Sequence, residues 1–328
     1  MKNLLLAGIF ICIPLSSGAA DAYHYRHNAD FLSPPVGQDT IGDGHGDIAV
    51  SASGDIYVSV QGGERPGVQI YGPDGKYKSN LEGAASDFHG FRIHRDRNGV
   101  EYLYATELKG ERLVKWTLDG KLVLAVAMDE SVPSGLQARH FLFKGVRLTG
   151  IAISSDDRIF VTDGYGSSRI HEFDQQGHYV RSIAGKSAPY NFSTAHKVIV
   201  DRRFSPERLL VTDRENNRLV WLDFEGNLLT EHGGLRLPSA LAIQGDLLAV
   251  AELDGRITVL DKTGTVVATL GTNNNPDQIS TPKVKPGDWR AGTVTSPHGV
   301  TFDLEGNILV TEWNEWGRVL EFVREAPQ

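Results

Sequence analysis

Three histidines stand at the same point of a pattern that recurs along the chain. They are His89 in "DFHGFRI", His196 in "TAHKVIV" and His298 in "SPHGVTF", each at the start of an apolar, strand-like run. Three imidazoles with an open fourth position are the donor set of many catalytic zinc sites, and imidazole also suits other divalent transition metals. A single histidine of this kind is more simply a polar side chain bonded to water. Three at equivalent positions favour a shared metal ion.

The elements that must position these histidines are short strands in a sixfold repeat. Six apolar runs end at Val60, Glu107, Asp163, Asp213, Glu252 and Glu312, at intervals of 39 to 60 residues. Most are followed by a turn, an arginine and a third strand, as in "ERLVKW" and "NRLVWL", then by a glycine-bearing turn and a fourth strand. Four short strands per unit are typical of a propeller blade, so the sequence predicts an all-β, six-bladed β-propeller. A β-sandwich is the alternative, but it lacks such self-similarity.

Alignment of the six units places the histidines on alternate blades. The position of His298 in blade 6 corresponds to His89 in blade 2 and His196 in blade 4, and to Gly46, Thr149 and Ser239 in blades 1, 3 and 5. Because the first strand of each blade lines the central channel, three imidazoles about 120° apart should converge on the axis at one height. His45, one residue ahead of the aligned position, is expected at the channel mouth as a candidate substrate-binding residue.

The two ends of the chain should close the ring. The sixth unit stops after "RVLEFV", which leaves it without a fourth strand, and "YHYRHNADF" stands ahead of blade 1. We therefore expect residues near 23–31 to supply the outer strand of blade 6, which would cover exposed sheet edges. The predicted propeller spans residues 23–328.

The first 22 residues, "MKNLLLAGIFICIPLSSGAADA", have the features of a signal peptide. Lys2 precedes an apolar core, and "AADA" is a small-residue cleavage pattern, so we expect cleavage after Ala22 and a secreted or periplasmic protein. Cys12, the one cysteine, lies within this segment, which leaves no disulfide in the mature chain. No later segment is long and apolar enough for membrane insertion. The net charge of −8 argues against nucleic acid and anionic lipid as partners.

Four stretches together resemble the family of peptidyl-α-hydroxyglycine α-amidating lyases (peptidylamidoglycolate lyases), which have an NHL-type propeller. They are "FHGFRI", "VTDGYGSSRIHEF", "VTDRENNRLVWL" and "SPHGVTFD". The resemblance covers most of the predicted mature chain. It implies zinc at His89, His196 and His298, in agreement with the alignment.

The resemblance also implies roles for two residues that follow the acidic ends of blades 3 and 4. Tyr165, in "DGY", matches the family's catalytic tyrosine, and a nearby dication would lower its pKa from about 10 and favour the phenolate. Arg214, in "DREN", would hold a substrate carboxylate through paired hydrogen bonds. The alternatives are a turn tyrosine over the channel rim, and a salt bridge from Arg214 to Asp213 or Glu215.

The sequence departs from the family at two positions. Where the family has a substrate-binding arginine, this chain has Gln61, and Arg65 four residues on is the candidate substitute. The family's calcium-binding aspartate corresponds to Gly299, so a structural calcium held by the backbone carbonyls of Ile48 and Phe91 is doubtful.

The resemblance implies an exported, metal-dependent lyase. It would cleave the C–N bond of an N-(α-hydroxy)glycine-like compound, a small molecule or peptide C-terminus, giving an amide and glyoxylate. A related metal-assisted lyase or hydrolase of another small hydroxylated compound is one alternative. Another is an NHL-repeat scaffold that binds a ligand or protein without catalysis, because a fold does not determine a function. A structural component of the cell envelope, with an unremarkable channel, is the third.

Overall fold

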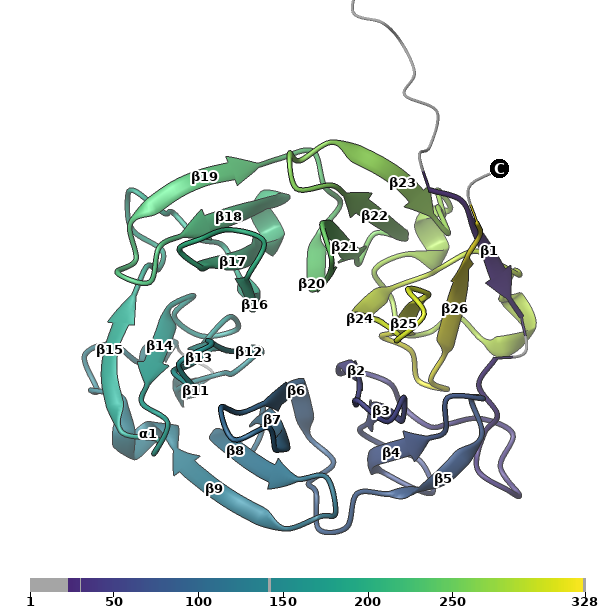
Figure 1. The fold of residues 1–328 in the computed structure, drawn as a ribbon, viewed down its shortest axis with the longest axis horizontal. Coiled ribbons are helices and arrows are strands. Elements are labelled where there is room, and N and C mark those ends of the chain that lie inside the picture. The colour runs from purple at the N-terminus through teal and green to yellow at the C-terminus, as the bar shows by residue number, and fades with distance from the viewer. Residues whose placement is uncertain (1–22, 30, 141–142, 327–328) are drawn as a thin grey trace, which may run out of the picture.

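A computed structural model describes residues 23–29, 31–140 and 143–326, and its strands form a ring of six blades (Figure 1). Each blade is a sheet of four antiparallel strands. The six-bladed, all-β prediction is therefore confirmed. Residues 1–22, predicted to be a signal peptide, lie outside the described part of the chain.

Each blade runs outward from the axis of the ring, with its first strand innermost (Figure 1). Blades 1 to 3 consist of β2 (Ile48–Val50), β3 (Ile56–Val60), β4 (Gly67–Tyr71) and β5 (Tyr77–Asn80); β6 (Phe88–Arg95), β7 (Glu101–Glu107), β8 (Arg112–Thr117) and β9 (Leu122–Ala127); and β12 (Gly150–Ile153), β13 (Ile159–Thr162), β14 (Ile170–Phe173) and β15 (Tyr179–Ile183). Blades 4 to 6 consist of β16 (Ala195–Asp201), β17 (Arg208–Asp213), β18 (Arg218–Leu222) and β19 (Leu228–His232); β20 (Pro238–Gln244), β21 (Leu247–Glu252), β22 (Arg256–Leu260) and β23 (Val266–Leu270); and β24 (Pro297–Phe302), β25 (Ile308–Glu312), β26 (Val319–Arg324) and β1 (Tyr25–Asn28).

The N-terminal strand closes the ring as expected. β1 pairs antiparallel with β26, from Tyr25 opposite Arg324 to Asn28 opposite Glu321. The Asn28 amide also donates a hydrogen bond to the Glu321 carboxylate at 2.7 Å. Pairing of the two chain ends within one blade covers an edge of β26 that would otherwise be open.

The hydrophobic core is divided among the interfaces between neighbouring blades. Blades 5 and 6, for example, pack Val259 and Ile257 against Val310 and Phe322, all nearly inaccessible to solvent. A comparable apolar cluster lies at each of the other five interfaces. This burial holds the innermost strands at fixed positions around the axis.

The acidic residues that end most second strands have a structural role. Asp213 accepts a hydrogen bond from Arg218 at 2.8 Å, and Glu107 accepts two from Arg112, at 2.6 and 3.0 Å. Each pair ties the end of a second strand to the start of the third. The recurring acid and arginine in the sequence are thus explained by local strand connection.

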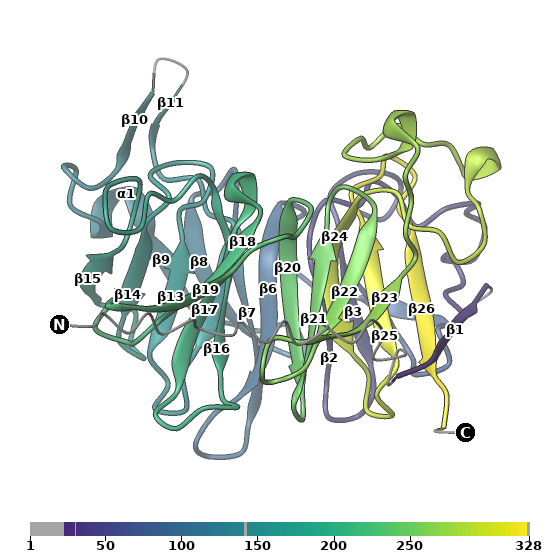
Figure 2. The same cartoon turned by 90° about the horizontal axis from the view of Figure 1, so that it is seen from above.

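Helix is scarce, as the sequence predicted. The described helices are α1 (Met128–Ser131) and three 3₁₀ turns, η1 (Arg214–Asn216), η2 (Pro276–Gln278) and η3 (Pro286–Asp288). The 128–147 and 272–296 connections stand at one end of the ring (Figure 2). The first of them contains the hairpin of β10 (Ala138–His140) and β11 (Phe143–Gly145). Each leads into the start of an innermost strand. No described helix has the length and apolar character needed to cross a membrane.

Candidate metal centre

His89, His196 and His298 come together at the axis from blades 2, 4 and 6. Their ring centroids are separated by 4.8 Å (His89–His298), 5.0 Å (His89–His196) and 5.0 Å (His196–His298), and all three side chains are buried. In each case the strand register shifts at the histidine, in β6, β16 and β24 respectively. Such irregularities redirect a side chain out of the regular alternation of a strand, which lets these imidazoles face the axis.

Backbone carbonyls of the intervening blades fix the orientation of the three rings. The Nδ1 atoms of His89, His196 and His298 contact the carbonyl oxygens of Thr149 at 2.9 Å, Ser239 at 2.7 Å and Gly46 at 3.2 Å. These three residues hold the positions in blades 3, 5 and 1 that the alignment matched to the histidines. A carbonyl can only accept, so each Nδ1 must carry the proton and donate it. Neutral rings then present Nε2 lone pairs, the arrangement found when histidine binds a metal.

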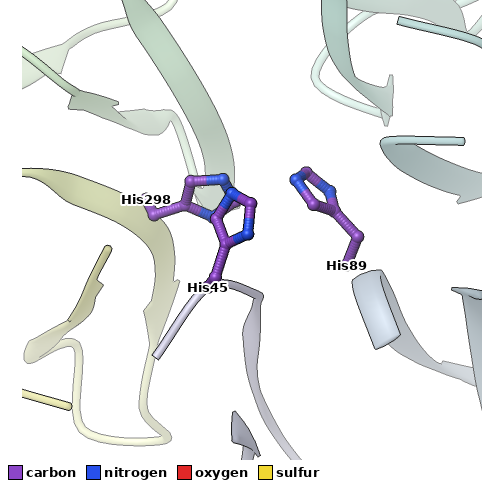
Figure 3. A group of neighbouring side chains, drawn as sticks. All are labelled: His45, His89 and His298. Carbon is purple, nitrogen blue, oxygen red and sulfur yellow. The ribbon is translucent and has the colours of Figure 1, made fainter. Parts of the chain in front are cut away.

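His45 is a fourth imidazole in the cluster and precedes β2 in blade 1. Its ring centroid lies 5.0 Å from that of His89 and 4.8 Å from that of His298 (Figure 3). The Trp313 ring lies 5.6 Å from that of His45. One ring nitrogen from each of His45, His89 and His298 lies within 4.8 Å of the others, so this group could hold a metal ion. Tetrahedral ligands about 2.1 Å from one ion would be about 3.4 Å apart. Ligation therefore requires a modest contraction of the cluster.

The surroundings keep these imidazoles neutral. Burial lowers the pKa of His45 to about 4, and the nearby Arg214 guanidinium acts in the same direction. Burial also lowers the pKa values of His89, His196 and His298 well below 6.5, and the neighbouring histidines add to this effect. Neutral imidazole is the form that binds metals.

The Tyr165 hydroxyl, supplied by the turn after β13, lies between two of these rings. Its oxygen is 3.1 Å from His89 Nε2, 3.0 Å from His196 Nε2 and 3.4 Å from a guanidinium nitrogen of Arg214. Arg214 also pairs with Glu215 at 2.9 Å, which is one of the two salt bridges considered from the sequence. Tyr165 therefore contacts the histidine cluster directly, and Arg214 contacts it through the Tyr165 hydroxyl.

The imidazole nitrogens around Tyr165 have more lone pairs than there are protons to satisfy them. If Nδ1 holds the proton on both His89 and His196, the two Nε2 atoms can only accept, and a single phenol proton satisfies one of them. His298 Nε2 is buried and has no hydrogen-bond partner among the described residues. Buried polar atoms without partners are costly. A divalent cation that accepts these lone pairs would remove the deficit, so the residues present fit such an ion.

The residues at the family's arginine position make other contacts. The side-chain amide of Gln61 donates to the His45 carbonyl at 2.7 Å, which secures the segment that carries this imidazole. Arg65 is exposed, and its guanidinium lies near the Tyr77 ring of outer strand β5, with one nitrogen 3.4 Å from the hydroxyl. A role for either residue in substrate binding remains a prediction.

The residues near Ile48 and Phe91 do not fit a calcium ion. A Cβ at Gly299 would lie 2.5 Å from Thr311 Oγ1 and 3.0 Å from the Asp47 Cα, so the family's aspartate has no space there. The Asp47 carboxylate instead accepts from the Phe91 backbone amide at 3.0 Å and forms a buried ion pair with Lys197. Calcium requires six to eight oxygen ligands, whereas here an ammonium already balances the carboxylate.

Sequence reasoning missed some of these neighbours. Lys197 directly follows His196, but its pairing with Asp47 crosses from blade 4 to blade 1 and is visible only in the closed ring. The contact between Trp313 and His45 also joins distant segments. The proximity of His45 to the aligned position was the one available signal for its place in the cluster.

Solved structures of two enzymes share the fold of the whole chain. A streptogramin B lyase structure is 14% identical and matches 92% of this chain and 98% of its own, with a TM-score of 0.57. A gluconolactonase from Xanthomonas campestris is 14% identical and matches 94% of this chain and 96% of its own, with a TM-score of 0.61. At these identities the similarity supports the fold alone.

Two sequence relatives are named for an enzymatic activity. Peptidyl-alpha-hydroxyglycine alpha-amidating lyase 2 of Drosophila melanogaster is 26% identical over 171 residues, which span 50% of this chain and 39% of the relative. A probable amidating lyase of Caenorhabditis elegans is 29% identical over 135 residues, 40% of this chain and 35% of the relative. No family model matches the chain. The resemblance to amidating lyases is confirmed at this modest identity, over well under half the length of the two relatives.

Proposed function

We propose that this protein is a metal-dependent carbon–nitrogen lyase that converts an N-(α-hydroxy)glycine-like compound into an amide and glyoxylate. The main support is the set of imidazoles whose Nδ1 atoms face backbone carbonyls and whose Nε2 atoms face the axis beside the Tyr165 hydroxyl. The two relatives named as amidating lyases indicate the reaction class. We propose His89, His196 and His298 as the metal ligands, with His45 beside them.

In this proposal, zinc or another divalent ion would supply Lewis-acid polarisation that makes the substrate hydroxyl more acidic. Tyr165 in its phenolate form accepts the hydroxyl proton. The C–O bond becomes the aldehyde carbonyl of glyoxylate while the C–N bond breaks, and Tyr165 returns the proton to the departing amide nitrogen. Proton transfer through one residue keeps the reaction balanced without an added oxidant or reductant.

Arg214 is suited to orient the substrate and to assist Tyr165. Its guanidinium carbon lies 5.3 Å from the centroid of the Tyr165 ring, so a carboxylate held there stays beside the phenol oxygen. Burial raises the pKa of Tyr165, whereas Arg214 lowers it and so favours the phenolate. The same cation therefore serves binding and proton transfer.

The decisive experiment measures metal content and glyoxylate release on the same purified protein. We expect about one divalent ion per chain, loss of glyoxylate release after chelation, and recovery on adding zinc. A His196→Ala variant should lose metal and activity together, whereas His178→Gln, at an exposed histidine outside the cluster, should keep both. A protein that carries no metal and releases no glyoxylate would favour a binding scaffold. Metal without glyoxylate release would favour a lyase or hydrolase of another hydroxylated compound.

A further inference from the structure

A cavity of about 440 Å³ lies at the opposite end of the axis from the histidines. The innermost strands begin at the histidine end, because His89 and His298 are the second residues of β6 and β24. The cavity is lined by later parts of the same strands, including Ile93, Val200 and Ile243. It is therefore a separate space at the other mouth of the ring.

The lining of this cavity contains more cationic than acidic side chains. It includes one carboxylate, Asp47, and four cationic side chains: Arg92, Lys197, Arg202 and Arg203. The protein as a whole has a net charge of −8, so this local excess is opposite in sign to the overall charge. A cavity lined in this way attracts anions and repels metal ions.

Three of the four cations have acidic partners. Lys197 forms the buried pair with Asp47, and Arg203 makes hydrogen bonds of 2.9 and 2.7 Å to Asp201. Arg202 donates to Glu207 at 3.2 Å and to the Ile153 carbonyl at 3.0 Å.

Arg92 differs from the other three. Its guanidinium has no hydrogen bond or ion pair among the described residues, although it lines the cavity. Burial lowers its pKa to about 10, and Arg202 acts in the same direction because the two positive charges repel, whereas the Asp47 carboxylate acts in the opposite direction. Arg92 is partly exposed to the cavity, and the Asp47 carboxylate, which is paired with Lys197, acts on it only through its charge. A bound anion would supply the hydrogen-bond acceptors that this guanidinium lacks.

We propose that this cavity is a binding site for a small oxyanion, a carboxylate or inorganic phosphate, with Arg92 as its principal ligand. A guanidinium donates two parallel hydrogen bonds to either group, and Arg202 adds a second positive charge from the adjoining wall. The volume lies in the range of small-molecule sites.

The site is distinct from the proposed metal centre. Asp47 and Lys197 form part of its lining, and their chain neighbours Gly46 and His196 belong to the histidine cluster. The buried ion pair therefore forms a wall between the two sites. The inference does not depend on the proposed lyase activity.

The test is calorimetric titration of the whole protein with inorganic phosphate and, separately, with succinate, at constant ionic strength. We expect saturable binding of at least one probe, and the probe that binds identifies the source of the anion. Arg92→Gln should weaken binding at least about tenfold, the usual loss for a hydrogen bond to a charged group. Arg95→Gln, on the same strand but exposed and outside the cavity, should leave the affinity unchanged.

Two further measurements separate this site from the histidine end. Binding should persist after chelation of metal and in Arg214→Gln, whose side chain lies beside Tyr165. In anion-free buffer, Arg92→Gln should unfold at the same or a higher temperature than the wild type, because the substitution removes the repulsion between Arg92 and Arg202. If Arg92→Gln does not fold, Arg202→Gln is expected to weaken binding in its place. The proposal is overturned if neither probe saturates, if Arg92→Gln binds like the wild type, or if binding is lost with the metal.

Discussion

Replacement of Tyr165 by phenylalanine isolates the hydroxyl on which the proposed mechanism depends. The ring should stay in place, because its contacts with His89 and His196, at centroid separations of 5.2 and 5.4 Å, do not involve the oxygen. The change removes oxygen contacts of 3.0, 3.1 and 3.4 Å to two imidazoles and Arg214. The variant thus tests proton transfer with little change in packing.

We expect turnover to fall by about 10²–10⁴-fold, the usual contribution of a positioned general base, or about 3–5.5 kcal/mol in the activation barrier. Metal content should stay at the wild-type level, because the imidazoles remain. The assays are steady-state glyoxylate release and metal analysis on the same samples. Tyr190→Phe is the matched control, since it removes a hydroxyl that donates to the Gly226 carbonyl at 2.6 Å, away from the cluster.

The pH dependence provides a second test of the same residue. Burial raises the pKa of Tyr165 above its usual value of 10.0, with Arg214 acting in the opposite direction. If phenolate is the base, kcat/KM should rise with pH as Tyr165 ionises, and Tyr165→Phe should lose this rise. A Tyr165→Phe protein with wild-type turnover and an unchanged pH profile would refute the proton-transfer role.

Three further predictions follow from the same cluster. Arg214→Gln should raise KM several-fold, and should shift the rise of kcat/KM to higher pH because a cation that lowers the Tyr165 pKa is lost. Alanine at His89 or His298 should remove metal and activity together without unfolding the ring, as checked by metal analysis and circular dichroism. The metal-free protein should lose stability as the pH falls from about 6.5 to 4, because folded His45, with a pKa of about 4, stays neutral while the unfolded chain binds a proton. The loss at this residue approaches about 3 kcal/mol near pH 4 and is about 2 kcal/mol at pH 5, so urea unfolding at pH 7 and pH 5 should show the latter, with His45→Gln reducing it.

The fold was predictable from sequence because its information is local and repeated. Each blade carries its own alternation of strand and glycine turn. In four of the six blades the acid at the end of the second strand pairs with an arginine nearby in the chain, as Asp213 does with Arg218. The closing strand was predictable because the sixth unit lacks a fourth strand and β1 supplies it. Six repetitions of one unit leave few other ways to bury the apolar faces.

The rings of His89, His196 and His298 lie 4.8 to 5.0 Å apart, because equivalent residues of equivalent strands converge on one axis. Their role as metal ligands stays a prediction. The carbonyl contacts of Nδ1 could not be predicted in the same way. They depend on the exact spacing between adjacent blades, which the apolar clusters set. The Asp47–Lys197 pair joins residues 150 positions apart, so sequence proximity gives no indication of it.

The distribution of charge along the axis unites these features. At one end, carbonyl partners and burial keep the imidazoles neutral, so their lone pairs can accept a cation without an accompanying carboxylate. At the other end, Arg92 adds a positive charge whose guanidinium makes no hydrogen bond or ion pair with the described residues, although Asp47 attracts it through its charge. Between them lies the buried Asp47–Lys197 pair, whose two charges balance each other and whose carboxylate also accepts from the Phe91 backbone amide. A cation at the histidine end would accept the Nε2 lone pairs, and an anion at the other end would supply hydrogen-bond acceptors to Arg92, so we expect the two ends of one channel to prefer ligands of opposite charge.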